Sequence, residues 1–172
     1  MNDRMSFISD KIVNLQKAQL LCEGWRMKGE KIVFTNGCFD ILHRGHLHYL
    51  AHAAQLGSRL IIGLNSDSSI RQLNKSPERP INDEESRAFL LAGMGVVDLV
   101  IIFEEQTPLN LIEKLIPDVL VKGGDYDEQE DKKNNPRYIV GSDFVKKNGG
   151  YVQTIPIKEG FSTTLTIKKL RV

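Results

Sequence analysis

Five short apolar runs, each rich in β-branched residues, are separated by segments long enough to form a helix. The run at 59–64, RLIIGL, is apolar almost throughout, as is typical of a parallel strand covered on both faces. Parallel strands need helical crossovers, so the alternation predicts a three-layer α/β domain with a parallel sheet of about five strands. The expected strands are 31–35, 59–64, 98–103, 119–121 and 151–155. Ligands of such sheets bind beyond the carboxyl ends of the strands.

Helix signals fill the intervals between these runs. Segment 11–28 predicts one N-terminal helix with an apolar face made of Ile12, Leu15, Leu20 and Trp25. Stretch 65–82 contains two prolines and predicts a short helix followed by a long loop. Further helices are expected at 45–56, 83–94, 108–116 with Thr107 as the cap, 136–147 and 162–170.

The chain divides into an expected helical arm, residues 1–30, and a main domain, residues 31–172. The arm either caps the core of its own chain or packs on a partner, so a homodimer is one of two alternatives. Two cysteines without a CxxC pair, and an N-terminus without an apolar signal core, fit a cytoplasmic protein.

Composition excludes several classes of protein. A hydrophobic fraction of 41% and a charged fraction of 26% argue against general disorder. The net charge of +1 argues against a basic nucleic-acid-binding protein. The longest apolar stretch, 96–103, is far shorter than the roughly 20 residues of a membrane-spanning helix. We therefore expect no nucleic-acid or membrane partner.

All four histidines lie between positions 43 and 52, directly after the first predicted strand. His43 and His46 share one face at the start of a helix, and Gly45 between them lets a ligand approach the backbone. Free backbone N–H groups at a helix N-terminus bind phosphate, so this motif predicts a phosphate site. Two surface histidines without a ligand are the plainer alternative. Zinc held with Cys38 is disfavoured, because neither CxxC nor HExxH occurs.

Other phosphate-binding motifs are absent. The chain has no GxGxxG after a strand, no GxxxxGK[ST] and no GxSxG. Dinucleotide dehydrogenases, P-loop enzymes and α/β-hydrolases are therefore disfavoured. A phosphate-binding α/β domain without these motifs needs another phosphate chemistry.

Basic residues surround the long middle loop. Lys75, Arg79 and Arg87 could close over a polyphosphate, although a solvated charged loop is the alternative for each of them. Lys122 and Gly123 end the fourth predicted strand at the ligand edge of the sheet, where a plain turn is equally expected.

Hydroxyl residues open the last predicted helix. Ser162 and Thr163 offer a second anion site at that helix N-terminus, and an ordinary N-cap is the alternative.

Five blocks in order resemble the HxGH nucleotidyltransferase superfamily, of cytidylyltransferase-like type. They are TNGCFDILHRGH (35–46), LNSDSS (64–69), RPINDEESR (79–87), LVKGGDY (120–126) and EGFSTT (159–164). Within that superfamily the chain is most similar to the heptose 1-phosphate adenylyltransferases, which make ADP-heptose for the lipopolysaccharide inner core. Many of these relatives carry the activity behind a sugar kinase domain. No kinase fits in the remaining length here, so the resemblance implies a stand-alone transferase with a Rossmann-like fold.

The resemblance also implies a role for each matching residue. His43 and His46 would act on the ATP phosphates, and Lys75 and Arg87 would hold the leaving pyrophosphate or the sugar phosphate. Asp40 and Arg79 are assigned to the sugar phosphate, with loop bonding as an equal alternative for Asp40. Mg²⁺ would bridge phosphate oxygens without a dedicated protein site. The remaining nucleotide- and phosphate-binding residues would be Cys38, Phe39, Gly45, Lys122, Gly123, Asp125, Gly160, Phe161, Ser162, Thr163 and Thr164.

The implied reaction joins ATP and heptose 1-phosphate to give ADP-heptose and pyrophosphate. Two alternatives stay open. One is a glycerol-3-phosphate cytidylyltransferase-like enzyme, which the EGFSTT block would also suit. The other is a protein that binds nucleotide without turning it over. The loop 73–80 is about one residue longer than the family pattern, which leaves open whether Lys75 is the mobile lysine. Segment 127–135 is also longer than in many relatives.

Overall fold

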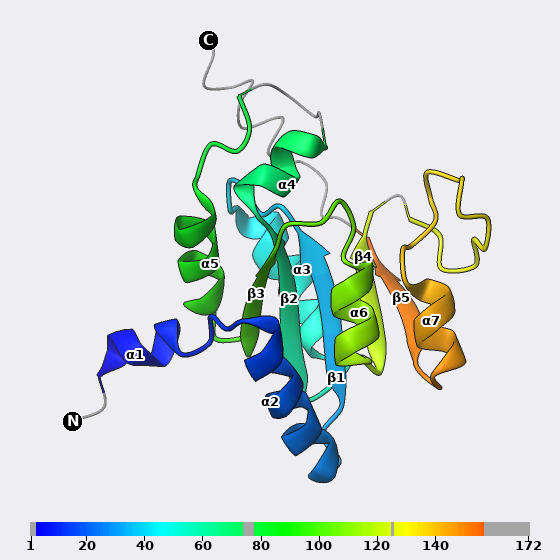
Figure 1. The fold of residues 1–172 in the computed structure, drawn as a ribbon, viewed down its shortest axis with the longest axis horizontal. Coiled ribbons are helices and arrows are strands. Elements are labelled where there is room, and N and C mark those ends of the chain that lie inside the picture. Colours follow the sequence, from blue (N-terminus) through cyan, green and yellow to red (C-terminus); the bar gives the residue numbers. More distant parts are fainter. Residues whose placement is uncertain (1–2, 74–77, 125, 157–172) are drawn as a thin grey trace.

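A five-stranded parallel sheet forms the centre of the computed structural model, which describes residues 3–73, 78–124 and 126–156. The strands lie side by side in the order β3-β2-β1-β4-β5 (Figure 1). This arrangement confirms the predicted α/β class and the number of strands. Their bounds are β1 Ile32–Gly37, β2 Arg59–Asn65, β3 Leu99–Phe103, β4 Val119–Gly123 and β5 Tyr151–Ile155.

Helices cover both faces of the sheet and make the outer layers (Figure 1). One face packs against α2, α6 and α7 in a single apolar cluster, and the other face packs against α3 and α5. Both clusters take residues from every central strand, so β1, β2 and β4 are buried on both sides. The helices are α1 Arg4–Ser9, α2 Leu15–Met27, α3 Arg44–Ala54, α4 Asp67–Gln72, α5 Glu84–Ala92, α6 Leu109–Leu115 and α7 Ser142–Lys147. No helix in the described ranges is long and apolar enough to cross a bilayer.

The helix predicted over 11–28 is present but shorter than expected. It begins only at Leu15, as α2, and before it Ile12 makes a parallel bridge with Val100. Backbone bonds from Val13 N to Val100 O (3.0 Å) and from Val100 N to Lys11 O (2.9 Å) hold this segment extended. The apolar face also differs, because α2 buries Ala18 and Cys22 completely while Leu20 is 65% exposed. Pairing with β3 outweighs the helical propensity of residues 11–14.

Two other helix predictions need correction. The helix expected at 136–147 begins only at Ser142. Gly141 before it has a φ of 87°, and a Cβ there would lie 2.7 Å from Ile112, so the close approach to α6 requires glycine. Thr107 does not cap α6, because Pro108 occupies the cap position without a side-chain hydrogen bond.

The strand order indicates where on the sheet a ligand is expected to bind. The chain runs outward from β1 in both directions, through β2 and β3 on one side and through β4 and β5 on the other. The switch point therefore lies between β1 and β4, beyond their carboxyl ends. That is where a ligand crevice is expected.

Candidate functional site

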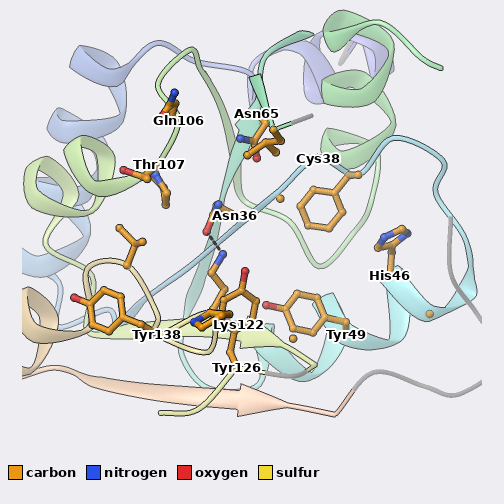
Figure 2. A pocket seen from close by; sticks show the side chains of 18 of the residues that line it. Asn36, Cys38, His46, Tyr49, Asn65, Gln106, Thr107, Lys122, Tyr126 and Tyr138 are labelled. Atoms are coloured by element: carbon orange, nitrogen blue, oxygen red, sulfur yellow. Dashed lines mark hydrogen bonds between the residues drawn. The ribbon is translucent and has the colours of Figure 1, made fainter. Parts of the chain in front are cut away.

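A cavity of about 610 Å³ opens at this switch point, beyond the carboxyl ends of β1, β2 and β4. Seven of the predicted site residues line it. They are Cys38, Phe39, His43, Gly45, His46, Lys122 and Gly123. Figure 2 shows His46 toward one end of the cavity and Tyr138 and Thr107 toward the other, with Asn36 and Lys122 between them.

The two histidines of the HRGH motif lie at the start of α3. His43 is the N-cap residue, and its Nδ1 accepts a long hydrogen bond of 3.4 Å from the backbone N of His46. The two rings stack with centroids 3.9 Å apart. Phe39, in the turn after β1, has a left-handed backbone (φ 45°) and meets His46 edge-on at 5.4 Å. The turn after β1, the N-cap residue and the first turn of α3 therefore hold the two imidazoles side by side.

Both imidazoles are neutral near pH 7. Burial, with smaller contributions from His43 and Arg79, lowers the pKa of His46 to about 4. Burial also lowers the pKa of His43. In the described part of the chain, Nδ1 of His46 is the one buried side-chain nitrogen or oxygen without a hydrogen-bond partner. A neutral imidazole has one N–H donor and one acceptor, so this ring keeps hydrogen-bonding capacity for a ligand.

Asp40 is buried and bonds to the loop that precedes α5. Its Oδ2 accepts from Arg79 Nε (2.9 Å), and its Oδ1 accepts from the backbone N of Ile81 (2.7 Å) and Asn82 (3.1 Å). The side chain of Asp40 is fully buried and that of Arg79 is 15% exposed. Neither residue is among the described residues that line the cavity. The geometry fits the loop-bonding alternative for Asp40.

Arg87 lies under the site, and its guanidinium is fully buried. Nη1 donates to the carbonyls of Cys38 and Asn65, both at 2.7 Å. Nε donates to Asn82 O (3.0 Å), and Nη2 pairs with Asp67 Oδ1 (2.6 Å). The expectation that Arg87 contacts phosphate does not fit this position, because its donors are engaged by protein oxygens. Arg87 instead ties the turn after β1 to the end of β2 and the start of α5.

The floor of the cavity is formed by β1 and β4. Lys122 Nζ donates to Asn36 Oδ1, and it lies 5.3 Å from the ring centroid of Tyr126. Behind them, the hydroxyls of Tyr49 and Thr35 share a buried hydrogen bond of 2.7 Å. Lys122 and Asn36 therefore place a cation and an amide side by side at the switch point.

Several lining residues were not expected from the sequence. Asn36 and Asn65 lie near the ends of β1 and β2, and a search for polar residues at predicted strand ends would have found them. Gln106 and Thr107 follow β3 in the same way. Lys133 lies in the charged segment 127–135 and Tyr138 in the helix expected at 136–147, and no local signal marks either as a lining residue.

The other predicted residues lie outside the described residues. They are Lys75, Asp125, Gly160, Phe161, Ser162, Thr163 and Thr164.

The charge of the cavity suits an anion. None of the described lining residues is Asp or Glu, whereas Lys122 and Lys133 are cations. Within the described ranges, no group of three or more His, Cys, Asp or Glu side chains could hold a metal ion. The cavity thus offers imidazoles, ammonium groups, amides and a helix N-terminus, which are groups that can stabilise phosphate charge.

Comparisons with known proteins identify a family and several similar chains. Residues 34–169 match the family model described as cytidylyltransferase-like. The bifunctional protein HldE of Magnetococcus marinus is 48% identical over 162 residues, which are 94% of this chain and 31% of that protein. The HldE of Campylobacter concisus is 51% identical over 158 residues, which are 91% and 31% of the two chains. The chain thus spans about a third of the length of these curated relatives.

Two solved structures are also similar to this chain. The lipopolysaccharide core biosynthesis protein from Thermoplasma volcanium is 32% identical, with a TM-score of 0.58 over 76% of this chain and 98% of that one. A pantoate-beta-alanine ligase from Francisella tularensis, 13% identical with a TM-score of 0.53 over 86% of this chain and 67% of that one, shares the fold alone. The family match covers most of the chain and confirms the superfamily indicated by the HxGH motif. The chain belongs to the cytidylyltransferase-like family.

Proposed function

We propose that this chain transfers AMP from ATP to heptose 1-phosphate, giving ADP-heptose and pyrophosphate. The observation that carries the proposal is the pair of stacked, neutral imidazoles at the N-terminus of α3, which face a cavity free of described carboxylates. A site of this kind suits a reaction in which phosphate charge must be stabilised.

The acceptor needs no activation by a base. A phosphate monoester is already ionised at neutral pH, so one of its oxygens attacks the α-phosphorus of ATP directly. The bond from the α-phosphorus to the bridging oxygen of the β-phosphate breaks, and pyrophosphate leaves with that electron pair. The protein has only to align the two phosphates in line and stabilise the charge that develops.

His43 and His46 supply this stabilisation. Neutral rings are not repelled by the nearby Arg79, and each one can donate an N–H to a phosphate oxygen. Backbone N–H groups of the first turn of α3 add donors that need no reorganisation during the reaction. Gly45, which is buried in this turn, leaves room for the phosphate to approach.

The other roles follow from the family resemblance. Cys38 and Phe39 contact the nucleotide beside the histidines, and Lys122 and Gly123 surround the nucleoside. The resemblance assigns Lys75 and the EGFSTT block to the phosphates and Asp125 to the nucleoside. Arg79 remains a candidate for the sugar phosphate through the guanidinium nitrogens beyond Nε. We assign Arg87 to positioning the turn at Cys38 rather than to a phosphate.

Magnesium enters with the nucleotide. The described lining of the cavity has no carboxylate cage, which fits an ion held by phosphate oxygens and water. When bound, Mg²⁺ would neutralise charge on the transferring and leaving phosphates.

The comparisons support an acceptor from the lipopolysaccharide core. The solved protein at 32% identity is named for that biosynthesis, and it aligns over nearly its whole length. The family name also covers the cytidylyltransferase alternative, so the nucleotide must be tested directly.

The test is pyrophosphate release with Mg²⁺ and either ATP or CTP. The acceptors would be both anomers of heptose 1-phosphate, hexose 1-phosphates and glycerol 3-phosphate. Release with ATP and one heptose anomer is the expected result. Release only with CTP and glycerol 3-phosphate would move the chain to the alternative activity. Nucleotide binding without release from any pair would contradict an enzymatic role.

A further inference from the structure

A second hollow, of about 470 Å³, adjoins the site cavity between α6 and α7. The two hollows share four lining residues, Thr107, Lys133, Tyr138 and Val140, which therefore separate them. Two of the four, Lys133 and Tyr138, carry polar side chains that also contact Asp143. We call these two side chains the partition.

One carboxylate holds the partition in place. Tyr138 donates its hydroxyl hydrogen to Asp143 Oδ1 (2.8 Å), and Lys133 Nζ lies 3.0 Å from Asp143 Oδ2. Asp143 lies in the first turn of α7, where a negative charge is favourable. Both partners lower the pKa of Asp143, so the carboxylate is ionised at neutral pH. The loop that carries the partition is therefore fastened to a helix of the core.

The partition retains hydrogen-bonding capacity after these contacts. The Tyr138 hydroxyl donates its hydrogen to Asp143 and also interacts with the Ser142 hydroxyl, which leaves a further lone pair as an acceptor. An ammonium group has three donors, and Lys133 directs one of them to Asp143. An acceptor beside a donor matches a sugar hydroxyl, which both donates and accepts. The ring of Tyr138 adds an apolar surface for the carbon skeleton of the sugar.

The position of the partition in the cavity indicates that it contacts the acceptor rather than ATP. In the proposed reaction the phosphates gather at His46, and the nucleoside lies along Lys122 and Gly123 at the end of β4. Tyr138 lies toward the end of the cavity away from His46, with Thr107 near it (Figure 2). The acceptor's phosphate must lie in line with the leaving pyrophosphate. The end of the cavity away from His46 then remains for the acceptor's sugar.

We propose that the partition binds the sugar of the acceptor, with Tyr138 and Lys133 contacting its hydroxyls and Asp143 acting as their positioning residue. The proposal rests on the proposed function, because it takes the acceptor to be a sugar phosphate. It adds a determinant of acceptor specificity on the loop between β4 and α7.

The test compares Tyr138→Phe and Asp143→Ala with wild type in two-substrate steady-state kinetics. Tyr138→Phe keeps the ring and removes the acceptor oxygen, whereas Asp143→Ala releases both partition side chains. We expect the KM for the sugar 1-phosphate to rise about tenfold in each, the effect of one lost hydrogen bond to substrate, with little change in kcat or in the KM for ATP. Preference for heptose over hexose 1-phosphate should shrink in parallel. Asp131→Asn, an exposed acid of the same loop, is the matched control.

Each result bears on the proposal. A sugar KM unchanged in both variants, or an equal rise in the KM for ATP, would overturn it. If wild type uses another acceptor, the same variants are assayed with that acceptor; a raised acceptor KM then supports the partition while the heptose assignment fails. If wild type turns over no pair, the proposed function and this inference fail together.

Discussion

The two ends of the cavity are held in different ways. Near the histidines, the turn after β1 is fixed by Asp40 and Arg87, which are 1% and 0% exposed. At the other end, Lys133 and Asp143 make an ion pair whose side chains are 71% and 55% exposed. Buried bonds therefore fix the end that we assign to the phosphates, while exposed bonds hold the end that we assign to the acceptor's sugar. Changes at the first end should alter stability and turnover, and changes at the second should alter substrate preference.

The largest effect is expected from Arg87→Met. The substitution leaves Asp67 without its buried cation and removes the donors to three backbone carbonyls. Removing one partner of a buried charged network costs about 3–5 kcal/mol of unfolding free energy. Urea unfolding of wild type, Arg87→Met and Arg87→Lys would measure this loss of unfolding free energy. A loss below about 1 kcal/mol would show that the network does not hold this end of the site.

A smaller effect is expected from pH. His46 has a pKa of about 4 in the folded protein, whereas an imidazole in the unfolded chain has its ordinary value near 6.5. Because the unfolded state binds the proton more readily, stability is full above pH 6.5 and falls as the pH drops toward 4. Allowing for partial exposure, the loss is on the order of 2 kcal/mol.

Urea unfolding at pH 7.5 and 4.5 would test this effect in wild type and His46→Gln. The wild-type protein should lose more stability than the variant over this interval. The same pH dependence in both proteins would mean that His46 is not held neutral by burial.

The smallest stability effect is expected from Asp143→Ala. An exposed ion pair contributes little, so the unfolding free energy should fall by about 0.5 kcal/mol. That change corresponds to a shift of about 1–2 °C in Tm for a chain of this size. A fall as large as that of Arg87→Met would remove the contrast between the two ends, because the partition would then be part of the fold's core.

The fold could be predicted because its signals are local. Apolar β-branched runs marked every strand to within a few residues, and the HRGH motif marked the start of α3. The predicted start of the helix over 11–28 was wrong, because Ile12 pairs instead with Val100, a residue far away in the sequence. Local patterns do not report such a contact.

The site could be predicted only in part, because several of its contacts also join residues that are far apart in the sequence. Arg87 was assigned to a phosphate because it is a basic residue beside the long middle loop and lies in a block that resembles the family. Its partners are mainly backbone carbonyls, which leave no trace in the residue types. Tyr138 was missed because its place in the cavity depends on a long loop fastened by Asp143.

We propose that neutral imidazoles at the start of α3 stabilise phosphate charge during the transfer. Pyrophosphate release by His46→Ala, measured against wild type with Mg-ATP and heptose 1-phosphate, tests it most directly. Loss of one preorganised stabiliser should lower kcat by about one-hundredfold or more. The KM for the sugar phosphate should change far less. A folded His46→Ala protein with normal kcat would contradict the account.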